Sequence, residues 1–355
     1  MLSRRQFNKL SLATAGATAV GTMGLRRASA DTPLVFAGWG GDYQNIHQQQ
    51  AFVDPFVEET GLEVLSVASP GNMLAIIKSQ VDSGNPEWDV VELTEPEVHI
   101  LAKEGYLVEI EYDADAKAQV PASLLNPYGA TVSYAAFVLA WNASEQSQPL
   151  TGWADMWNVA EFPGPRTACS WFPYENVEIA LLADGLSPSE INPLDDAKIE
   201  RAFAKWRQLQ DDLKVWWGSG GQSAQIFADG EVAVGAIYEN RIREAKAVNP
   251  ALAWTLNQAV VEKVHFVIPK SSQRIEEATL FINSTLRQEN QAAFVRVNQY
   301  GASNPLAYDL LTADERAANI GAPENLAVEL LYDGAFWAEA YPRYADAWEA
   351  LKAGS

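Results

Sequence analysis

Short apolar segments alternate with helical patterns over residues 34–105, and this alternation restricts the possible folds more than any other feature of the chain. Leu34–Ala37 is an apolar run closed by Gly38, which predicts a buried strand. A helical pattern follows, with apolar side chains on one face at Ile46, Phe52, Phe56 and Val57. The alternation continues with strands at 62–67 and 88–93 and helices at 73–81 and 96–103. This order predicts a parallel α/β sheet with short connections.

A longer strand-like run, Val132–Trp141, interrupts the alternation and is suited to crossing between two lobes. Beyond it we expect a second α/β unit, with a helix over 195–213, a strand over 232–238, and a strand over 264–269 that returns the chain to the first lobe. The expected divisions are a leader at 1–30, a first lobe at 31–141 and 264–307, a second lobe at 142–263, and a C-terminal helical segment at 308–355 packing across the lobes. Two such lobes enclose a cleft, where ligands commonly bind and around which lobes can close.

The first thirty residues carry the pattern of a secretory leader. Ser3-Arg4-Arg5-Gln6-Phe7 is followed by the uncharged stretch 10–25 and by Ala28-Ser29-Ala30, a small-residue cleavage site. Paired arginines before Phe indicate the twin-arginine variant. An amphipathic helix, the alternative, would need acidic residues on its polar face, and none precedes Asp31. We therefore expect export to the periplasm.

Charge and composition exclude several classes of partner and site. The formal net charge is −21, which argues against nucleic acid and anionic lipid as partners, because these need clustered Lys and Arg. Cys169 is the single cysteine and is expected to be a small buried hydrophobe rather than a nucleophile. The three histidines lie far apart in sequence, so a metal site is poorly supported. Twelve tryptophans would suit both a core and an aromatic cleft.

Motifs for catalysis are missing from the sequence. It contains no G-x-S-x-G, no HExxH, no P-loop and no Gly-rich dinucleotide fingerprint. The polar loop Gly218–Ser223 has no His or carboxylate beside its serines, so a flexible loop is the expected interpretation. We expect no enzyme and no cofactor; an exported enzyme whose acid and base are brought together by the fold remains the alternative.

Seven separated stretches carry a resemblance to a known family. They are Trp39–Gln44, Phe56–Val64, Ser83–Val91, Phe162–Arg166, Ala228–Val232, Tyr238–Arg241 and Gly301–Pro305. In this order the chain resembles the periplasmic solute-binding proteins of ABC transporters, within the spermidine/putrescine-binding group, over nearly all of the chain after the leader. The resemblance implies a type II periplasmic-binding fold, two-lobed and α/β, with the ligand in the cleft between the lobes.

The resemblance also implies where a ligand would be held. Proteins of this group hold ammonium groups with carboxylates and pack the methylene chain between aromatic rings, whose faces also attract cations. The loop after the second lobe's first strand would supply Trp171, Phe172 and Glu175. Before the strand at 266–269 the group usually carries Trp and Asp, whereas this chain has Glu262-Lys263-Val264-His265. Glu262 could still hold an ammonium, but the departure argues against a doubly charged polyamine.

Arg241 supports the same conclusion, since it follows the strand at 232–238, where ligands of this fold are often contacted. A guanidinium would repel a dication and would suit a carboxylate through paired hydrogen bonds. Binders of γ-aminobutyrate occur in this broad group. We therefore predict an ω-amino acid, with Arg241 on its carboxylate and Glu262 or Glu92 on its amine; a structural ion pair is the alternative role for Arg241.

Other candidate ligand contacts lie at strand ends, where open α/β sheets bind their ligands. Trp39 and Asp42 follow the first strand, and Glu92 and Thr94 close a later one. Trp39 could instead be a core residue, and Glu92 could cap the next helix. Tyr238 and Ser303 complete the set of candidates.

The partners implied by the resemblance are a small-molecule ligand, a membrane permease and its ATPase. The membrane would be reached through the permease alone, and we expect a monomer. A ligand-sensing receptor subunit is a further alternative for the same fold.

Overall fold

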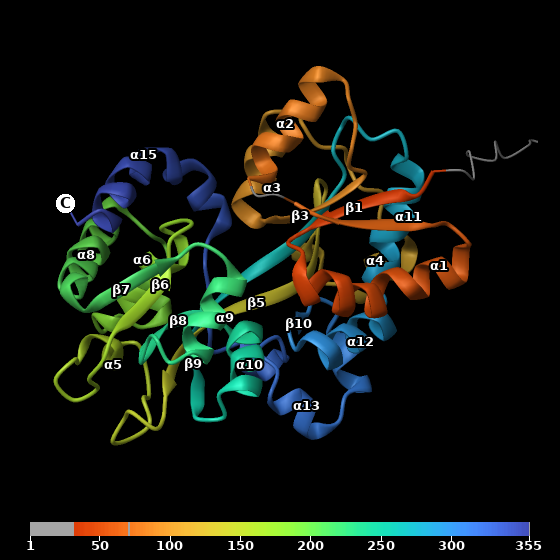
Figure 1. Cartoon of the computed structure of the whole chain (residues 1–355). Helices are drawn as coiled ribbons and strands as arrows, with labels where there is room; N and C mark the ends of the chain where they lie inside the picture. Colours follow the sequence, from red (N-terminus) through yellow and green to blue (C-terminus); the bar gives the residue numbers. More distant parts are fainter. Residues whose placement is uncertain (1–31, 70–71, 355) are drawn as a thin grey trace, which may run out of the picture. The chain divides into compact units, whose positions relative to one another are not determined.

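The structure is a computed structural model that describes residues 32–69 and 72–354 (Figure 1). The leader predicted at 1–30 lies outside the described residues. From Pro33 onward the chain forms one compact unit. None of the helices in the described ranges combines the length and the apolar character needed to cross a bilayer.

The strands of the described residues form one sheet, in the order β2-β1-β3-β9-β5-β8-β6-β7, with three short strands at its side. The main strands are β1 (Leu34–Gly38), β2 (Val64–Ala68), β3 (Val90–Thr94), β5 (Gly129–Asn142), β6 (Arg166–Cys169), β7 (Leu213–Trp217), β8 (Val234–Tyr238) and β9 (Leu252–Val267). The short ones are β4 (Leu125–Asn126) and β10 (Gly301–Ala302), which pair with β5, and β11 (Leu330–Leu331), which pairs with β9.

Parallel pairing dominates both ends of the sheet. In the first half, β1 pairs in parallel with β2 and β3. In the second half, β6 pairs in parallel with β7 and β8. Each parallel strand is followed by a helix, as the alternation in the sequence predicted. The two halves of Figure 1 correspond to these two groups of strands.

Two long antiparallel strands, β5 and β9, join the halves. They pair along most of their length, from Ala130 opposite Phe266 to Asn142 opposite Leu252, with irregularities near Thr131 and Phe137. β9 also pairs with β3 of the first half, and β5 pairs with β8 of the second. The crossing strand predicted at 132–141 is thus confirmed within β5. The strand predicted at 264–269 begins twelve residues earlier, at Leu252, because residues 252–263 continue the pairing with β5.

Helices of the first half and its connections cover 43–124 and 275–310. They are η1 (Tyr43–Val53), α1 (Asp54–Thr60), α2 (Met73–Ser83), α3 (Glu95–Lys103), α4 (Ala114–Gln119), η2 (Ala122–Leu124), α11 (Ile275–Thr285), α12 (Gln288–Asn298) and η4 (Pro305–Leu310). The first of them is a π-helix. This changes the exposed face: Ile46, predicted to be buried, is 42% exposed, because a π-helix has more residues per turn than the α-helical pattern assumes.

Helices of the second half and the C-terminal segment complete the chain. They are α5 (Ala154–Trp157), α6 (Tyr174–Ala183), α7 (Pro188–Ile191), α8 (Asp196–Arg207), η3 (Gln210–Asp212), α9 (Gly220–Ala228), α10 (Glu239–Val248), α13 (Ala313–Ala317), α14 (Pro323–Leu326) and α15 (Gly334–Lys352). The helix predicted at 195–213 ends at Arg207, six residues short. α15 packs against α3 of the first half and against α8 of the second.

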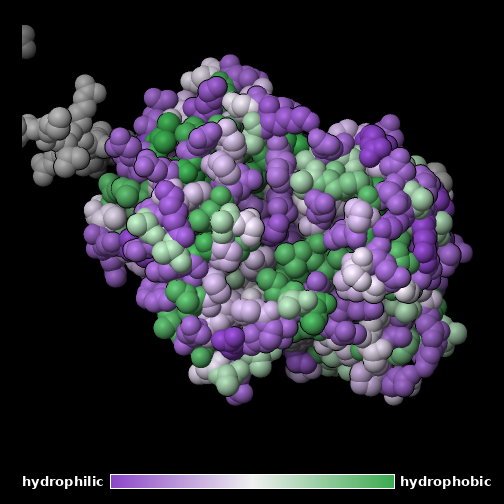
Figure 2. All heavy atoms as spheres, turned by 180° about the vertical axis from the view of Figure 1, so that it is seen from behind, coloured by the Kyte–Doolittle hydropathy of each residue, from purple (hydrophilic) through white to green (hydrophobic). Residues whose placement is uncertain are grey.

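The core lies on both faces of the sheet and contains many of the large aromatic side chains. Trp153, Trp206, Trp217, Trp337 and Trp348 are fully buried. Cys169 is also fully buried and unbonded to another cysteine, as predicted for a small hydrophobe. The face shown in Figure 2 is mostly hydrophilic, with smaller hydrophobic patches among the polar residues, in keeping with the net charge of −21.

Candidate ligand-binding site

Three buried carboxylates converge where the two halves of the sheet meet. Glu92 on β3, Glu175 in the first turn of α6 and Glu262 on β9 are 0%, 2% and 7% exposed. Glu92 lies opposite Phe266 in the β3–β9 pairing, so Glu262, four residues along β9, emerges on the same face of the sheet. The charge of Glu262 raises the pKa of both other carboxyls, so Glu262 links the other two members of the cluster.

Glu92 is held by two residues of the π-helix η1. The Tyr43 hydroxyl and the Gln48 amide, the latter at 3.1 Å, both donate to Glu92 Oε1. Residues five apart would point about 140° apart on an α-helix, whereas the wider turn of a π-helix brings them to one side. The buried Oε2 of Glu92 has no hydrogen-bond partner within the described ranges. Burial raises the pKa of Glu92 to about 8, against the opposing hydrogen bonds from Tyr43 and Gln48.

Glu262 is held by two tyrosines from different parts of the chain. The hydroxyl of Tyr238, at the end of β8, donates to Oε1 at 2.8 Å. The hydroxyl of Tyr332, just after β11, donates to Oε2 at 3.3 Å. Burial raises the pKa of Glu262 to about 7, while both hydrogen bonds lower it. The same carboxylate raises the pKa of both tyrosine hydroxyls, after burial, the largest cause.

Glu175 is the member of the cluster whose carboxyl receives the least stabilisation from hydrogen-bond donors. Its buried Oε2 accepts no hydrogen bond from the residues that the structure describes. Burial, and then the charge of Glu262, raise the pKa of the Glu175 carboxyl well above its usual range. The basic residues nearest in sequence to the cluster form ion pairs elsewhere: Lys263 with Glu95 at 2.7 Å and Arg241 with Glu244 at 3.0 Å. The cluster therefore has an excess of buried acidic groups, which suits the binding of a cation.

Aromatic rings surround the carboxylates. Trp39, after β1, stacks on Trp171, after β6, with ring centroids 6.4 Å apart and planes inclined by 15°. Trp39 is 38% exposed, so this pair from the two halves lies at the surface side of the junction. Deeper in, Trp171 contacts Tyr238 at 6.3 Å, and Tyr43 contacts Tyr300 at 5.4 Å. Such walls suit a ligand with methylene groups and a positive end.

Arg241 lies beside the cluster rather than within it. Its Nη1 bonds both carboxylate oxygens of Glu244 at 3.0 Å, so the ion pair considered as an alternative role is present. The guanidinium also packs against the start of α9, since a Cβ on Gly220 would lie 2.7 Å from its Nε. After burial, the charge of Arg241 is the largest influence on the pKa of Tyr300, which it lowers, whereas Glu262 and Glu92 raise it. Tyr300 is therefore influenced by both the positive and the negative groups.

Four other residues predicted as ligand contacts are outside this cluster or are used by the local fold. Asp42 is exposed at the start of η1. Thr94 forms a capping box with Glu97 at the start of α3, so Thr94 and not Glu92 caps that helix. Phe172 stacks on Tyr174 with centroids 4.8 Å apart, and Ser303 is buried with its backbone N–H donating to Gln291 at 2.8 Å.

Four residues of the site were missed by the sequence analysis: Tyr43, Gln48, Tyr300 and Tyr332. Tyr43 lies within the motif Trp39–Gln44, so its position was a usable signal. Tyr300 immediately precedes the motif Gly301–Pro305. Tyr332 had no signal, because it comes from the segment 308–355, which was expected only to pack across the lobes.

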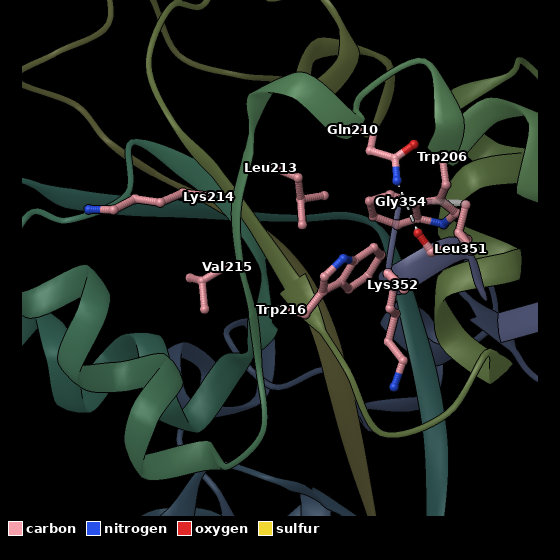
Figure 3. Close-up of a pocket in the computed structure, with 10 residues that line it drawn as sticks. Trp206, Gln210, Leu213, Lys214, Val215, Trp216, Leu351, Lys352 and Gly354 are labelled. Atoms are coloured by element: carbon pink, nitrogen blue, oxygen red, sulfur yellow. Dashed lines mark hydrogen bonds between the residues drawn. The ribbon is translucent and has the colours of Figure 1, made fainter. Parts of the chain in front are cut away.

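A cavity of about 270 Å³ lies elsewhere, between β7 and the end of α15 (Figure 3). Trp206, Trp216 and Gln210 line it, and the Gln210 amide donates to the Leu351 carbonyl at 3.2 Å. Lys352, also in its wall, donates to the Ser170 carbonyl at 2.8 Å. Both of these polar side chains thus have hydrogen-bond partners, unlike the oxygens of the carboxylate cluster that lack a partner in the described part of the chain. Within the described residues, no group of three His, Cys, Asp or Glu side chains has the arrangement of a metal site.

Comparison with known proteins agrees with the fold. The family model for bacterial extracellular solute-binding proteins matches residues 51–322. A γ-aminobutyric acid-binding protein of Pseudomonas aeruginosa is 30% identical over 296 residues, covering 82% of this chain and 83% of the relative. A spermidine/putrescine-binding periplasmic protein of Haemophilus influenzae is 28% identical over 265 residues, 71% of each chain.

A solved structure shows the same architecture. An ABC transporter substrate-binding protein from Bradyrhizobium japonicum superimposes with a TM-score of 0.84 at 28% identity, covering 90% of this chain and 99% of that one. The fold is thus the two-lobed α/β fold of periplasmic binding proteins, as the resemblance implied. Such proteins bind solutes and are not enzymes, and the family implies a periplasmic location. The extent of the matches establishes that this chain belongs to the bacterial extracellular solute-binding proteins.

Proposed function

We propose that this protein is the substrate-binding component of an ABC importer and captures a small ω-amino acid such as γ-aminobutyrate. The observation that carries the proposal is the buried cluster of Glu92, Glu175 and Glu262, enclosed by aromatic rings and flanked by Arg241. Closure of the two lobes would trap the solute, and the closed protein would deliver it to a membrane permease.

The carboxylate cluster supports an ammonium group as one end of the ligand. Glu92 and Glu175 each retain a buried oxygen without a hydrogen-bond partner among the described residues. An ammonium has three N–H donors, which can satisfy such oxygens and compensate the repulsion among the carboxylates. The faces of Trp39 and Trp171 would add attraction for the cation and contact with the methylene groups.

Arg241 supports a carboxylate at the other end. A guanidinium binds a carboxylate through two parallel hydrogen bonds, and here Tyr300 is influenced both by the charge of Arg241 and by the charges of Glu262 and Glu92. A zwitterion with its charges separated by methylene groups would match a site that has both negative and positive groups. The relative of Pseudomonas aeruginosa, which is named for γ-aminobutyric acid, adds weight to this choice.

A polyamine is the second candidate, favoured by the number of carboxylates. Three acidic groups lie at the junction, and Arg241 is already engaged by Glu244. The relative of Haemophilus influenzae is named for spermidine and putrescine. A diamine would place one ammonium at Glu175 and Glu262 and the other toward Glu92.

Calorimetric titration can separate the two candidates with γ-aminobutyrate, putrescine and butylamine as probes. We expect γ-aminobutyrate to bind most tightly. Arg241→Met should weaken γ-aminobutyrate by about tenfold or more while leaving butylamine unchanged, because only the former has a carboxylate. Arg201→Met, which removes an arginine paired with Asp184 on the surface, is the matched control. A higher affinity for putrescine than for γ-aminobutyrate would favour the polyamine as the ligand. The absence of binding by all three probes would refute the proposal.

The lobes of the proposed movement are residues 31–141 with 264–307 and residues 142–263, with the segment 308–355 packed across them. β5 and β9, which connect the halves of the sheet, are the segments that would bend. Scattering from the protein in solution should show a smaller radius of gyration with ligand. An unchanged radius under saturating γ-aminobutyrate would contradict closure.

We also propose export through the twin-arginine route. The support is the Arg4-Arg5 pair and the small residues at 28–30. Changing both arginines to lysine should retain the precursor in the cytoplasm of the producing bacterium. Export of the double variant at the normal rate would point to the general secretory route.

A further inference from the structure

The carboxylate cluster contains more negative charge than its surroundings compensate. Glu92 and Glu262 receive side-chain hydrogen bonds only from neutral donors among the described residues: the Tyr43 hydroxyl and the Gln48 amide on Glu92, and the hydroxyls of Tyr238 and Tyr332 on Glu262. The buried Oε2 of Glu175 has no such donor. Neutral donors stabilise a carboxylate without cancelling its charge. Three ionised carboxyls in one buried site repel each other, as in carboxylate pairs that share a proton.

The other titratable groups around the cluster add no compensating charge. The hydroxyls and the thiol that face it are Tyr43 on η1, Cys169 on β6, Tyr238 on β8, Tyr300 after α12 and Tyr332 after β11. The further acids are Glu95 and Glu97 on α3 and Glu178 on α6, together with Tyr174 on the same helix. Each of these groups is neutral or negative.

The basic groups near the cluster are engaged by other partners. Lys263, the next residue on β9, bonds Glu95; Arg241 bonds Glu244; and Lys352 bonds the Ser170 carbonyl and Glu349. The cluster in the ligand-free protein must therefore be neutralised by protons. Burial places the pKa of Glu262 at about 7 and that of Glu92 at about 8, so protons are bound near neutral pH.

We propose that capture of an ammonium group expels a proton from this cluster, so that the protein binds its solute more tightly as the pH rises across neutrality. The inference rests on the proposed function. In the exchange, one carboxyl O–H bond breaks and its proton passes to solvent, while an ammonium N–H donates to the resulting carboxylate. One positive charge replaces another, so the net charge of the buried site is unchanged.

The sign and size of the effect follow from linkage. Ligand binding stabilises the ionised carboxyls, so it lowers their pKa and releases protons wherever the ligand-free cluster still holds them. For one proton per ligand, affinity should fall about tenfold for each pH unit below the titration of the ligand-free cluster. Above it, affinity should level off until the ammonium of the ligand itself titrates, near pH 10 for an alkyl amine.

The experiment is calorimetric titration of the full exported protein with γ-aminobutyrate, from about pH 6 to about pH 8. Each pH is measured in two buffers of different ionisation enthalpy, phosphate and MOPS, and the difference in observed heat gives the protons released. We expect release of up to one proton per ligand at the lower pH, decreasing as the pH rises, with the matching change in affinity.

Variants assign the proton to the cluster. Glu175→Gln removes a buried carboxyl whose pKa is raised by burial and by Glu262, and which can therefore hold a proton, so release should decrease and the pH dependence of affinity should flatten. Glu58→Gln, an exposed glutamate on α1, should release protons as the wild type does. Binding without proton release at any pH, or with proton uptake, would overturn this inference and leave the proposed function standing. No binding of γ-aminobutyrate, putrescine or butylamine would instead refute the proposed function.

Discussion

The two tyrosines that hold Glu262 form hydrogen bonds of different length, so their loss should reduce ligand affinity to different extents. Tyr238 donates to one carboxylate oxygen at 2.8 Å and Tyr332 to the other at 3.3 Å. A hydrogen bond to a charged group contributes about 1.5–3 kcal/mol, and bonds between oxygens weaken beyond about 3.0 Å. Removing only the hydroxyl, by Tyr→Phe, should therefore cost more at Tyr238 than at Tyr332.

The magnitudes can be stated as losses of ligand affinity. Tyr238→Phe should cost about 2 kcal/mol, a loss of about thirtyfold, because it removes a short bond to the ionised form that binds the ammonium. Tyr332→Phe should cost about 1 kcal/mol, or about fivefold, because its bond is long. Both changes should also raise the pKa of Glu262, since both hydrogen bonds lower it.

The assay is calorimetric titration with γ-aminobutyrate at pH 7, with thermal unfolding as a check that each variant is folded. Tyr341→Phe is the matched control: Tyr341 lies on α15 and packs on the ring of Tyr174, and it is not one of the two tyrosines that donate to Glu262. It should bind as the wild type does. A Tyr332→Phe loss equal to or above that of Tyr238→Phe, or an equal loss for Tyr341→Phe, would refute the reasoning from bond length.

Three further predictions concern stability. Burial raises the pKa of Glu178 to about 8, so the folded state keeps a proton that the unfolded state releases above about pH 4.3. The protein should therefore lose stability as the pH rises toward 8. Glu178→Gln should flatten that decline in a series of thermal unfolding measurements at different pH. Gly235→Ala should destabilise the protein by about 1–3 kcal/mol in denaturant titration, because its Cβ would lie 2.5 Å from Thr167, whereas Gly221→Ala, with open space around it, should be neutral or slightly stabilising. Arg166→Met should lower the free energy of unfolding by about 3 kcal/mol or more in calorimetric unfolding. The buried guanidinium donates to the carbonyls of Met156, Phe162 and Gly164, and these carbonyls would lose their partner. A change below about 1 kcal/mol would mean that water replaces the guanidinium as the donor.

Much of the fold could be predicted because its elements are long or strongly patterned. The apolar run at 132–141 has no interruption and lies within β5. The position of Ile46 could not be predicted, because the choice between π and α turns depends on tertiary contacts such as those of Tyr43 and Gln48 with Glu92. Amphipathic periodicity assumes 3.6 residues per turn and fails where that assumption fails.

The candidate site was predictable in kind but not in its full membership. Glu92, Glu175 and Glu262 were each nominated by strand ends or by the family resemblance, although their convergence requires the register of β3 with β9. Tyr332 is contributed by a chain segment seventy residues beyond Glu262, and its position depends on the pairing of β11 with β9. A pairing of two residues leaves too short a pattern to be recognised in a sequence.

The stacked indoles of Trp39 and Trp171 also provide an optical reporter. One ring belongs to each half of the sheet, and the rings lie 6.4 Å apart at 15°. A movement that opens the halves would separate the rings and expose the indoles further to water. Emission from the pair should then shift to longer wavelength, although ten other tryptophans contribute a background. A single Trp39→Phe variant would isolate the signal by difference, so the chain can report the position of its own lobes without an added dye.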